Sequence, residues 1–84
     1  MDFEELTLFL KSHLKDADIA VTDLTGTRDH LGIQIISDEF EGKGLLDQHR
    51  MVMDILKEKL KQEIHAVQLK TMTKTKARER GLIS

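Results

Sequence analysis

The sequence predicts an α+β fold in which helices cover one face of a three-stranded mixed sheet. The apolar residues change from helical spacing to strict alternation and back along the chain, in the order helix, strand, strand, helix, strand. A short loop separates the first two strands, which favours an antiparallel hairpin. A helix separates the second strand from the third, and such a crossover is nearly always right-handed and makes the two strands parallel.

The first predicted element is a helix that begins near residue 2 and ends near Lys15. Asp2 and Glu5 have the spacing of a capping box. Lys11 and Lys15 lie where the carboxyl end of a helix favours cations. The side chains that recur at helical intervals are Phe3, Leu6, Phe9 or Leu10, and His13 or Leu14.

Two strands and a loop follow this helix. Residues 19–24 are typical of a strand, and residues 25–29 of the loop that closes a hairpin. Residues 30–37 form the second predicted strand, with Leu31, Ile33 and Ile35 on one face.

The second half of the chain predicts a long helix and a third strand. Gly42 and Gly44 precede an apolar stripe at helical spacing, and the pattern leaves open one break near Arg50. Residues 64–72 alternate again, which predicts the third strand. Residues 74–84 are basic and predict either a solvated tail or a short helix. The stripe consists of Leu45, Val52, Ile55, Leu56 and Leu60.

Composition limits the class of protein. The 84 residues predict one domain over residues 1–84, near the size at which a single core becomes marginal. The apolar runs are far too short to span a bilayer. The first five residues lack a secretory signal and are too acidic for a mitochondrial presequence. We therefore expect a soluble, cytoplasmic protein that does not bind membranes.

The sequence also predicts a protein without catalytic activity. Because the chain has no cysteine, it can form neither disulfides nor cysteine zinc sites and has no thiol nucleophile. It contains no glycine-rich phosphate loop, no H-E-x-x-H pattern and no supported Ser/His/Asp set. The net charge of -2 gives no global attraction to nucleic acid.

Two segments carry a family resemblance. One is Phe40-Glu41-Gly42-Lys43-Gly44-Leu45-Leu46-Asp47-Gln48-His49-Arg50, and the other is Ile64-His65-Ala66-Val67. Together they resemble the BolA-like family, and the resemblance runs from near residue 2 to residue 73. It implies a class II KH-like fold with the order α-β-β-α(α)-β, which agrees with the order that the periodicity predicts.

Three of the four histidines can be interpreted from the residues around them, and two of these have competing interpretations. His13 lies beside Leu10 and Leu14, and we expect it to pack at the edge of the first helix. His49 either contacts a phosphate or a partner, or packs on the helix and bonds a backbone carbonyl. His65 shares its predicted face with Val67 and Leu69, which favours a capping or core role, and the alternative is a ring that points toward a partner.

The resemblance gives His65 a different role. It implies that His65 is a ligand of a [2Fe-2S] cluster that the chain shares with a monothiol glutaredoxin, while the partner and its glutathione supply the thiolates. Imidazole binds iron in its neutral form, and histidine in place of thiolate raises the reduction potential. No cofactor is expected in the isolated chain.

A second ligand is implied in the hairpin loop. Family members carry a histidine or a cysteine there, whereas residues 25–29 contain neither and His30 stands at the carboxyl end of the loop. His30 is therefore the candidate for the second ligand. The alternative is an exposed residue that begins a strand.

Two functions follow as expectations. The first is an adaptor that binds a monothiol glutaredoxin in iron-sulfur cluster trafficking or iron sensing. The second is a nucleic-acid-binding transcriptional regulator, although Gly42-Lys43-Gly44 is one residue short of the GXXG loop of KH domains and precedes the helix. The free chain is expected to be a monomer or a weak homodimer. The expected surface for a partner or nucleic acid consists of Asp47, Gln48, His49 and Arg50 at the start of the long helix and Lys74, Lys76, Arg78 and Arg80 at the basic end.

Overall fold

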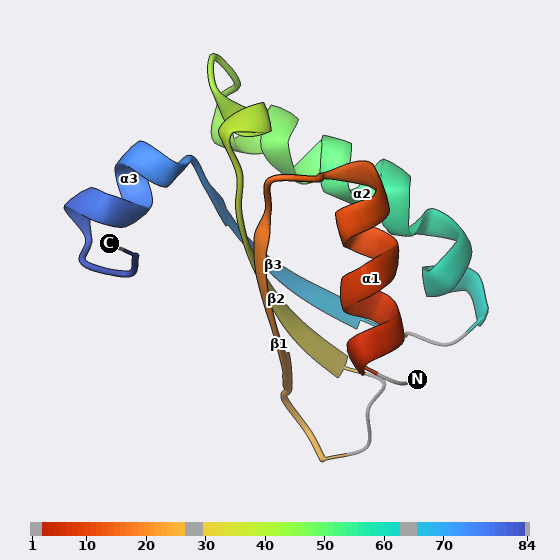
Figure 1. The fold of residues 1–84 in the computed structure, drawn as a ribbon. Coiled ribbons are helices and arrows are strands. Elements are labelled where there is room, and N and C mark those ends of the chain that lie inside the picture. Colours follow the sequence, from red (N-terminus) through yellow and green to blue (C-terminus); the bar gives the residue numbers. More distant parts are fainter. Residues whose placement is uncertain (1–2, 27–29, 63–65, 84) are drawn as a thin grey trace.

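The structure is a computed structural model that describes residues 3–26, 30–62 and 66–83. Its elements follow the predicted order. The helices are α1 (Phe3–His13), α2 (Leu45–Gln62) and α3 (Lys74–Glu79), the strands are β1 (Asp18–Asp23), β2 (His30–Ile36) and β3 (Ala66–Met72), and a 3-10 turn, η1 (Asp38–Phe40), precedes α2 (Figure 1).

The three strands form a mixed sheet with β2 in the centre. β1 and β2 are antiparallel, so that Asp18 faces Ile36. β2 and β3 are parallel, so that His30 faces Ala66. The predicted topology is therefore confirmed, and both parallel strands start at the same end of the sheet.

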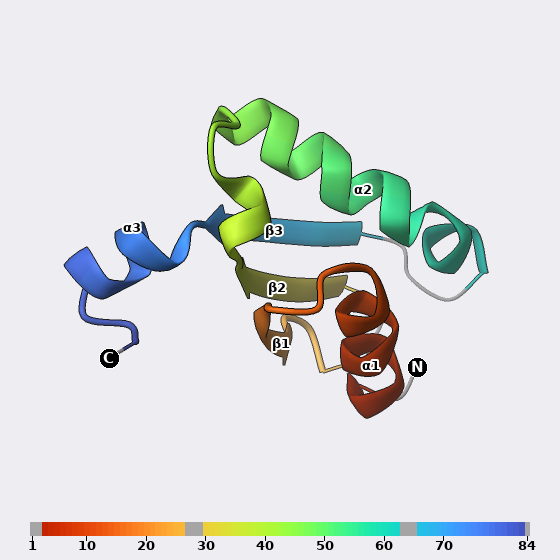
Figure 2. The same ribbon diagram turned by 45° about the horizontal axis from the view of Figure 1, so that its top comes forward.

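The main core lies between the sheet and the helices α1 and α2, which cover the same face (Figure 2). Leu31, Ile33 and Ile35 of β2 are fully or almost fully buried, as their alternation predicts. Removing one such aliphatic side chain from water contributes about 1.5–3 kcal/mol to stability. The helices contribute Leu6, Leu10, Leu14, Val52 and Leu56 to the same cluster.

The two predicted helices differ from the observed ones in detail. α2 is one unbroken helix, so the break left open near Arg50 is not present. Arg50 is exposed and is a good helix former, while Val52 and Leu56 keep the inner face apolar on one continuous stripe. α1 ends at His13, two residues early, and the Ser12 hydroxyl donates to the carbonyl of Phe9 at 2.6 Å.

The basic end of the chain is the short helix α3, and the alternative of a solvated tail is wrong. The Thr73 hydroxyl caps the helix by accepting from the backbone N–H of Lys76. Ala77 is fully buried in a second cluster with Ile36 and Met72. Gly81 ends the helix at φ 71°, a backbone conformation that suits glycine. α3 therefore packs against the last residues of β2 and β3.

No helix among residues 3–26, 30–62 and 66–83 has the length and apolar character needed to cross a bilayer.

Candidate functional site

His30, one of the two predicted cluster ligands, lies at the end of the sheet where β2 and β3 start. His30 is the first residue of β2 and stands opposite Ala66, the first residue of β3. The carbonyl of His30 accepts from the backbone N–H of Leu24 at 2.9 Å, which holds the start of β2 against the end of β1. The fold thus places His30 beside the residue that directly follows His65 in the chain. His65 itself lies outside the described residues, and its predicted role as a ligand stays a prediction.

His30 belongs to the open face of the sheet. Its neighbours Leu31 and Ile33 alternate with it and are buried beneath the helices on the opposite face. His30 is half-buried. A half-buried imidazole at the edge of the molecule fits a ligand that a partner can reach, and it fits equally a residue that only begins a strand. The chain has no thiolate of its own to complete a soft-metal site.

The start of α2 differs from the expected surface at Gln48. This side chain is only 8% exposed, because its Oε1 accepts from the Thr71 hydroxyl at 2.7 Å and its Nε2 donates to the Lys43 carbonyl at 2.9 Å. Gln48 is therefore mostly buried and does not project from the start of α2, and its place in a partner surface stays a prediction. It fastens the loop before α2 to β3, and only Asp47 and Arg50 of the predicted set are exposed here.

His49 is half-buried on α2. Its Nε2 is buried and has no hydrogen-bond partner among the described residues. Half-burial is compatible with the interpretation in which the ring packs against the protein, but this nitrogen lacks the predicted bond to a carbonyl.

The four basic residues of the carboxyl end separate into different environments. Lys76 and Arg80 line a cavity of about 340 Å³ together with Leu45 and Gln48 of α2. Lys74 instead lies 3.8 Å from the carboxylate of Asp16. The structure thus brings Lys76 and Arg80 to the start of α2, as predicted, while Lys74 serves the fold and Arg78 lines no part of this cavity.

Asp16 is a structural residue that the sequence analysis missed. Its Oδ1 accepts from the Ser37 hydroxyl at 2.6 Å, and its Oδ2 accepts from the backbone N–H of Asp38 at 2.7 Å. The Ser37 hydroxyl, the Asp38 N–H and the charge of Lys74 lower the pKa of Asp16, against the opposing effect of partial burial. One carboxylate therefore joins the turn after α1 to the end of β2 and to α3. No local sequence pattern indicates this role, because Asp16 and Ser37 lie 21 residues apart in the chain.

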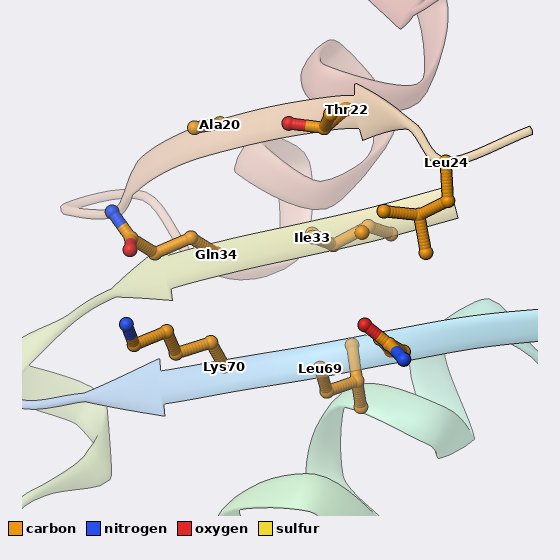
Figure 3. Close-up of a pocket in the computed structure, with 9 residues that line it drawn as sticks. Ala20, Thr22, Leu24, Ile33, Gln34, Leu69 and Lys70 are labelled. Atoms are coloured by element: carbon orange, nitrogen blue, oxygen red, sulfur yellow. The ribbon is translucent and has the colours of Figure 1, made fainter. Parts of the chain in front are cut away.

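The open face of the sheet carries a second hollow, of about 480 Å³. Figure 3 shows Ala20 and Thr22 on β1, Gln34 on β2 and Lys70 on β3 along this hollow. The Leu24 side chain extends over Gly32, and a Cβ added at Gly32 would lie 3.3 Å from the Leu24 Cδ2. The glycine thus makes room for Leu24 on the same face as His30.

Comparison with known proteins gives the family. The model of the BolA-like protein family matches residues 1–76. Protein BOLA2 of Arabidopsis thaliana is 40% identical over 68 residues, which are 80% of this chain and 72% of that protein. The DNA-binding transcriptional regulator BolA of Escherichia coli strain K12 is 38% identical over 48 residues, which are 57% of this chain and 46% of that protein. The crystal structure of a bol-like protein from Babesia bovis has a TM-score of 0.83 at 29% identity and covers 96% of this chain and 94% of its own. The fold, the motif around residues 40–50 and these matches agree, and the chain belongs to the BolA-like protein family.

Proposed function

We propose that this protein is a non-catalytic adaptor that binds a monothiol glutaredoxin and shares a [2Fe-2S] cluster with it, in iron-sulfur cluster trafficking or iron sensing. The observation that supports this most is the parallel register of β2 and β3, in which His30 faces Ala66. This register sets His30 and the residue after His65 side by side at one exposed end of the sheet. His30, with His65 next to Ala66 in the sequence, would suit a cluster held between two proteins.

The ligand chemistry explains why a partner is needed. A chain without cysteine can offer imidazoles but no thiolates, and the glutaredoxin and its glutathione would supply those. Histidine ligation raises the reduction potential of such a cluster above that of an all-thiolate site. Because imidazole must be neutral to bind iron, acid weakens the shared cluster. A raised reduction potential and a cluster that acid weakens both suit cluster transfer to another protein, or a sensor of redox state or pH.

The experiment is a titration of a glutathione-loaded monothiol glutaredoxin cluster with the purified chain, followed by visible circular dichroism. The proposal predicts a new spectrum that saturates at one chain per glutaredoxin, and a heterodimer of the same stoichiometry by native mass spectrometry. A glutaredoxin spectrum that stays unchanged at excess chain would contradict it.

A second candidate function, nucleic-acid binding in transcriptional regulation, draws on the similarity to the Escherichia coli regulator. The exposed Lys76 and Arg80 could contact phosphates. The chain, however, lacks an aromatic surface for stacking bases, because Phe40 is fully buried and Phe3 and Phe9 are half-buried. Fluorescence anisotropy with duplex DNA at low and moderate salt tests this function, which requires binding that weakens steeply with salt.

A further inference from the structure

We propose that the groove between the start of α2 and α3 is a docking site for an acidic, amphipathic segment of a second protein, separate from the end of the sheet that bears His30. This inference goes beyond cluster sharing and does not depend on it. It rests on the shape of the groove, on two cations that form no ion pair with a described residue, and on the position of the groove in the fold.

The groove is firmly built. Its lining includes the hydrogen-bonded pair of Gln48 and Thr71, whose polar atoms satisfy each other at 2.7 Å. Met72 belongs to the small core that holds α3, so the wall formed by the helix is anchored. Leu45 forms part of the lining and is 61% exposed, which leaves a large apolar side chain mostly open to solvent. An apolar side chain from another protein would cover it.

The charge of the groove favours an acidic occupant. Lys76 lies on α3 and Arg80 caps the carboxyl end of this helix four residues later, and both are exposed and line the groove. Neither forms an ion pair with a described residue, whereas Lys74 on the same helix already has Asp16. Two cations beside an apolar wall match a carboxylate that lies close to a leucine-like side chain.

A protein segment fits this groove better than nucleic acid does. The cavity of about 340 Å³ has the size of a site for one or two side chains, and no aromatic residue lines it for stacking on a base. The chain as a whole is slightly acidic, which opposes a polyanion at longer range. A short segment with few carboxylates avoids this cost.

The position of the groove gives it a separate role. β2 and β3 start at His30 and Ala66, and α3 lies at the opposite end of the two strands (Figure 1). Because Lys76 of α3 lines the groove, the groove lies at that end too. Seven residues of β3 extend over roughly 20 Å. A partner at the His30 end and an acidic segment in the groove can therefore bind at the same time.

The test uses the chain of residues 1–84 and a short, blocked, fluorescent peptide of glutamate and leucine. We expect saturable binding at low salt that weakens as salt rises. Lys76→Gln with Arg80→Gln should weaken binding roughly tenfold. The matched control is Lys11→Gln with Lys57→Gln, which removes the same charge from exposed positions outside the groove and should have no more than a small effect.

The apolar contact has its own matched pair. Leu45→Ser should weaken peptide binding, whereas Leu46→Ser should not, because Leu46 is equally exposed but does not line the groove. Equal effects of the paired variants would overturn the proposal, as would equal binding of a peptide with glutamine in place of glutamate. Tighter binding of a DNA oligonucleotide than of the peptide, through Lys76 and Arg80, would also overturn the proposal. So would light scattering that shows the binding signal to come from self-association of the protein.

Discussion

At the scale of single residues, Asp16 contributes more to the fold than any sequence motif indicates. Its carboxylate accepts hydrogen bonds from the fully buried Ser37 and from the backbone of Asp38. Asp16→Ala leaves the Ser37 hydroxyl without this acceptor, and we expect the free energy of unfolding to fall by about 1–3 kcal/mol. Urea denaturation measures it. Asp18→Ala, at an exposed position two residues on, is the control, and equal losses from the two variants would contradict this role.

The same carboxylate predicts a pH dependence of stability. The pKa of Asp16 in the folded protein is below its ordinary value of 3.8, so the folded state favours the ionised form. Its contribution is fully present above pH 3.8 and is lost as the pH falls through the lowered pKa. The difference in melting temperature between the wild type and Asp16→Ala should therefore be constant near neutral pH and shrink in strong acid. A difference that grows on acidification would refute the assignment.

His30 carries a prediction that separates its two interpretations. We expect His30→Ala to change the visible spectrum of the mixed cluster less than His65→Ala does, because its fixed place at the start of β2 limits how far the ring can reach. Parallel titrations of the two variants with the loaded glutaredoxin measure this. If both variants abolish the mixed cluster to the same extent, His30 is a full ligand.

At the scale of elements, α3 is part of the fold as well as a carrier of charge. Removing residues 74–84 would expose Ile36 and Met72, which Ala77 helps to bury, and would remove the charge of Lys74 beside Asp16. We expect this truncation to lower the free energy of unfolding by about 1–3 kcal/mol. Full-length Lys76→Gln/Arg80→Gln separates charge from packing and should unfold like the wild type. A truncated chain as stable as the full one would show that α3 does not contribute.

The elements with a clear apolar period were predictable from the sequence. The alternation of Leu31, Ile33 and Ile35 predicted the inner face of β2. The short loop between β1 and β2 predicted an antiparallel pair, and the helix between β2 and β3 predicted a parallel pair, which together make the sheet mixed. α3 was ambiguous because its one buried anchor, Ala77, is small and gives no periodic signal.

The candidate site was predictable only in part, for a related reason. The parallel register places His30 as the order of elements predicts. The burial of Gln48 could not be read from its polar neighbours, because it depends on the Thr71 hydroxyl 23 residues away. Asp16 was missed for the same reason, since its partner Ser37 comes from another part of the chain. Local patterns show which face is apolar, but they do not show which polar groups satisfy each other across the fold.

At the scale of the whole molecule, the parallel strands separate two surfaces. The starts of β2 and β3 present His30, and their ends lead to α3 and the groove (Figure 1). α1 and α2 cover one face of the sheet between these two ends. The proposed adaptor function needs two surfaces that do not compete, and these two ends of the sheet would provide them on one small domain.

The central claim is that this chain supplies an imidazole to a cluster that it shares with a monothiol glutaredoxin. The most direct measurement is the lifetime of the mixed cluster, by visible circular dichroism, with His65→Ala in place of the wild type. If His65 is a cluster ligand, the variant melts at the same temperature as the wild type and still loses the mixed cluster faster. An unchanged spectrum and lifetime would contradict the claim, and a lowered melting temperature with an unchanged cluster would assign His65 to packing.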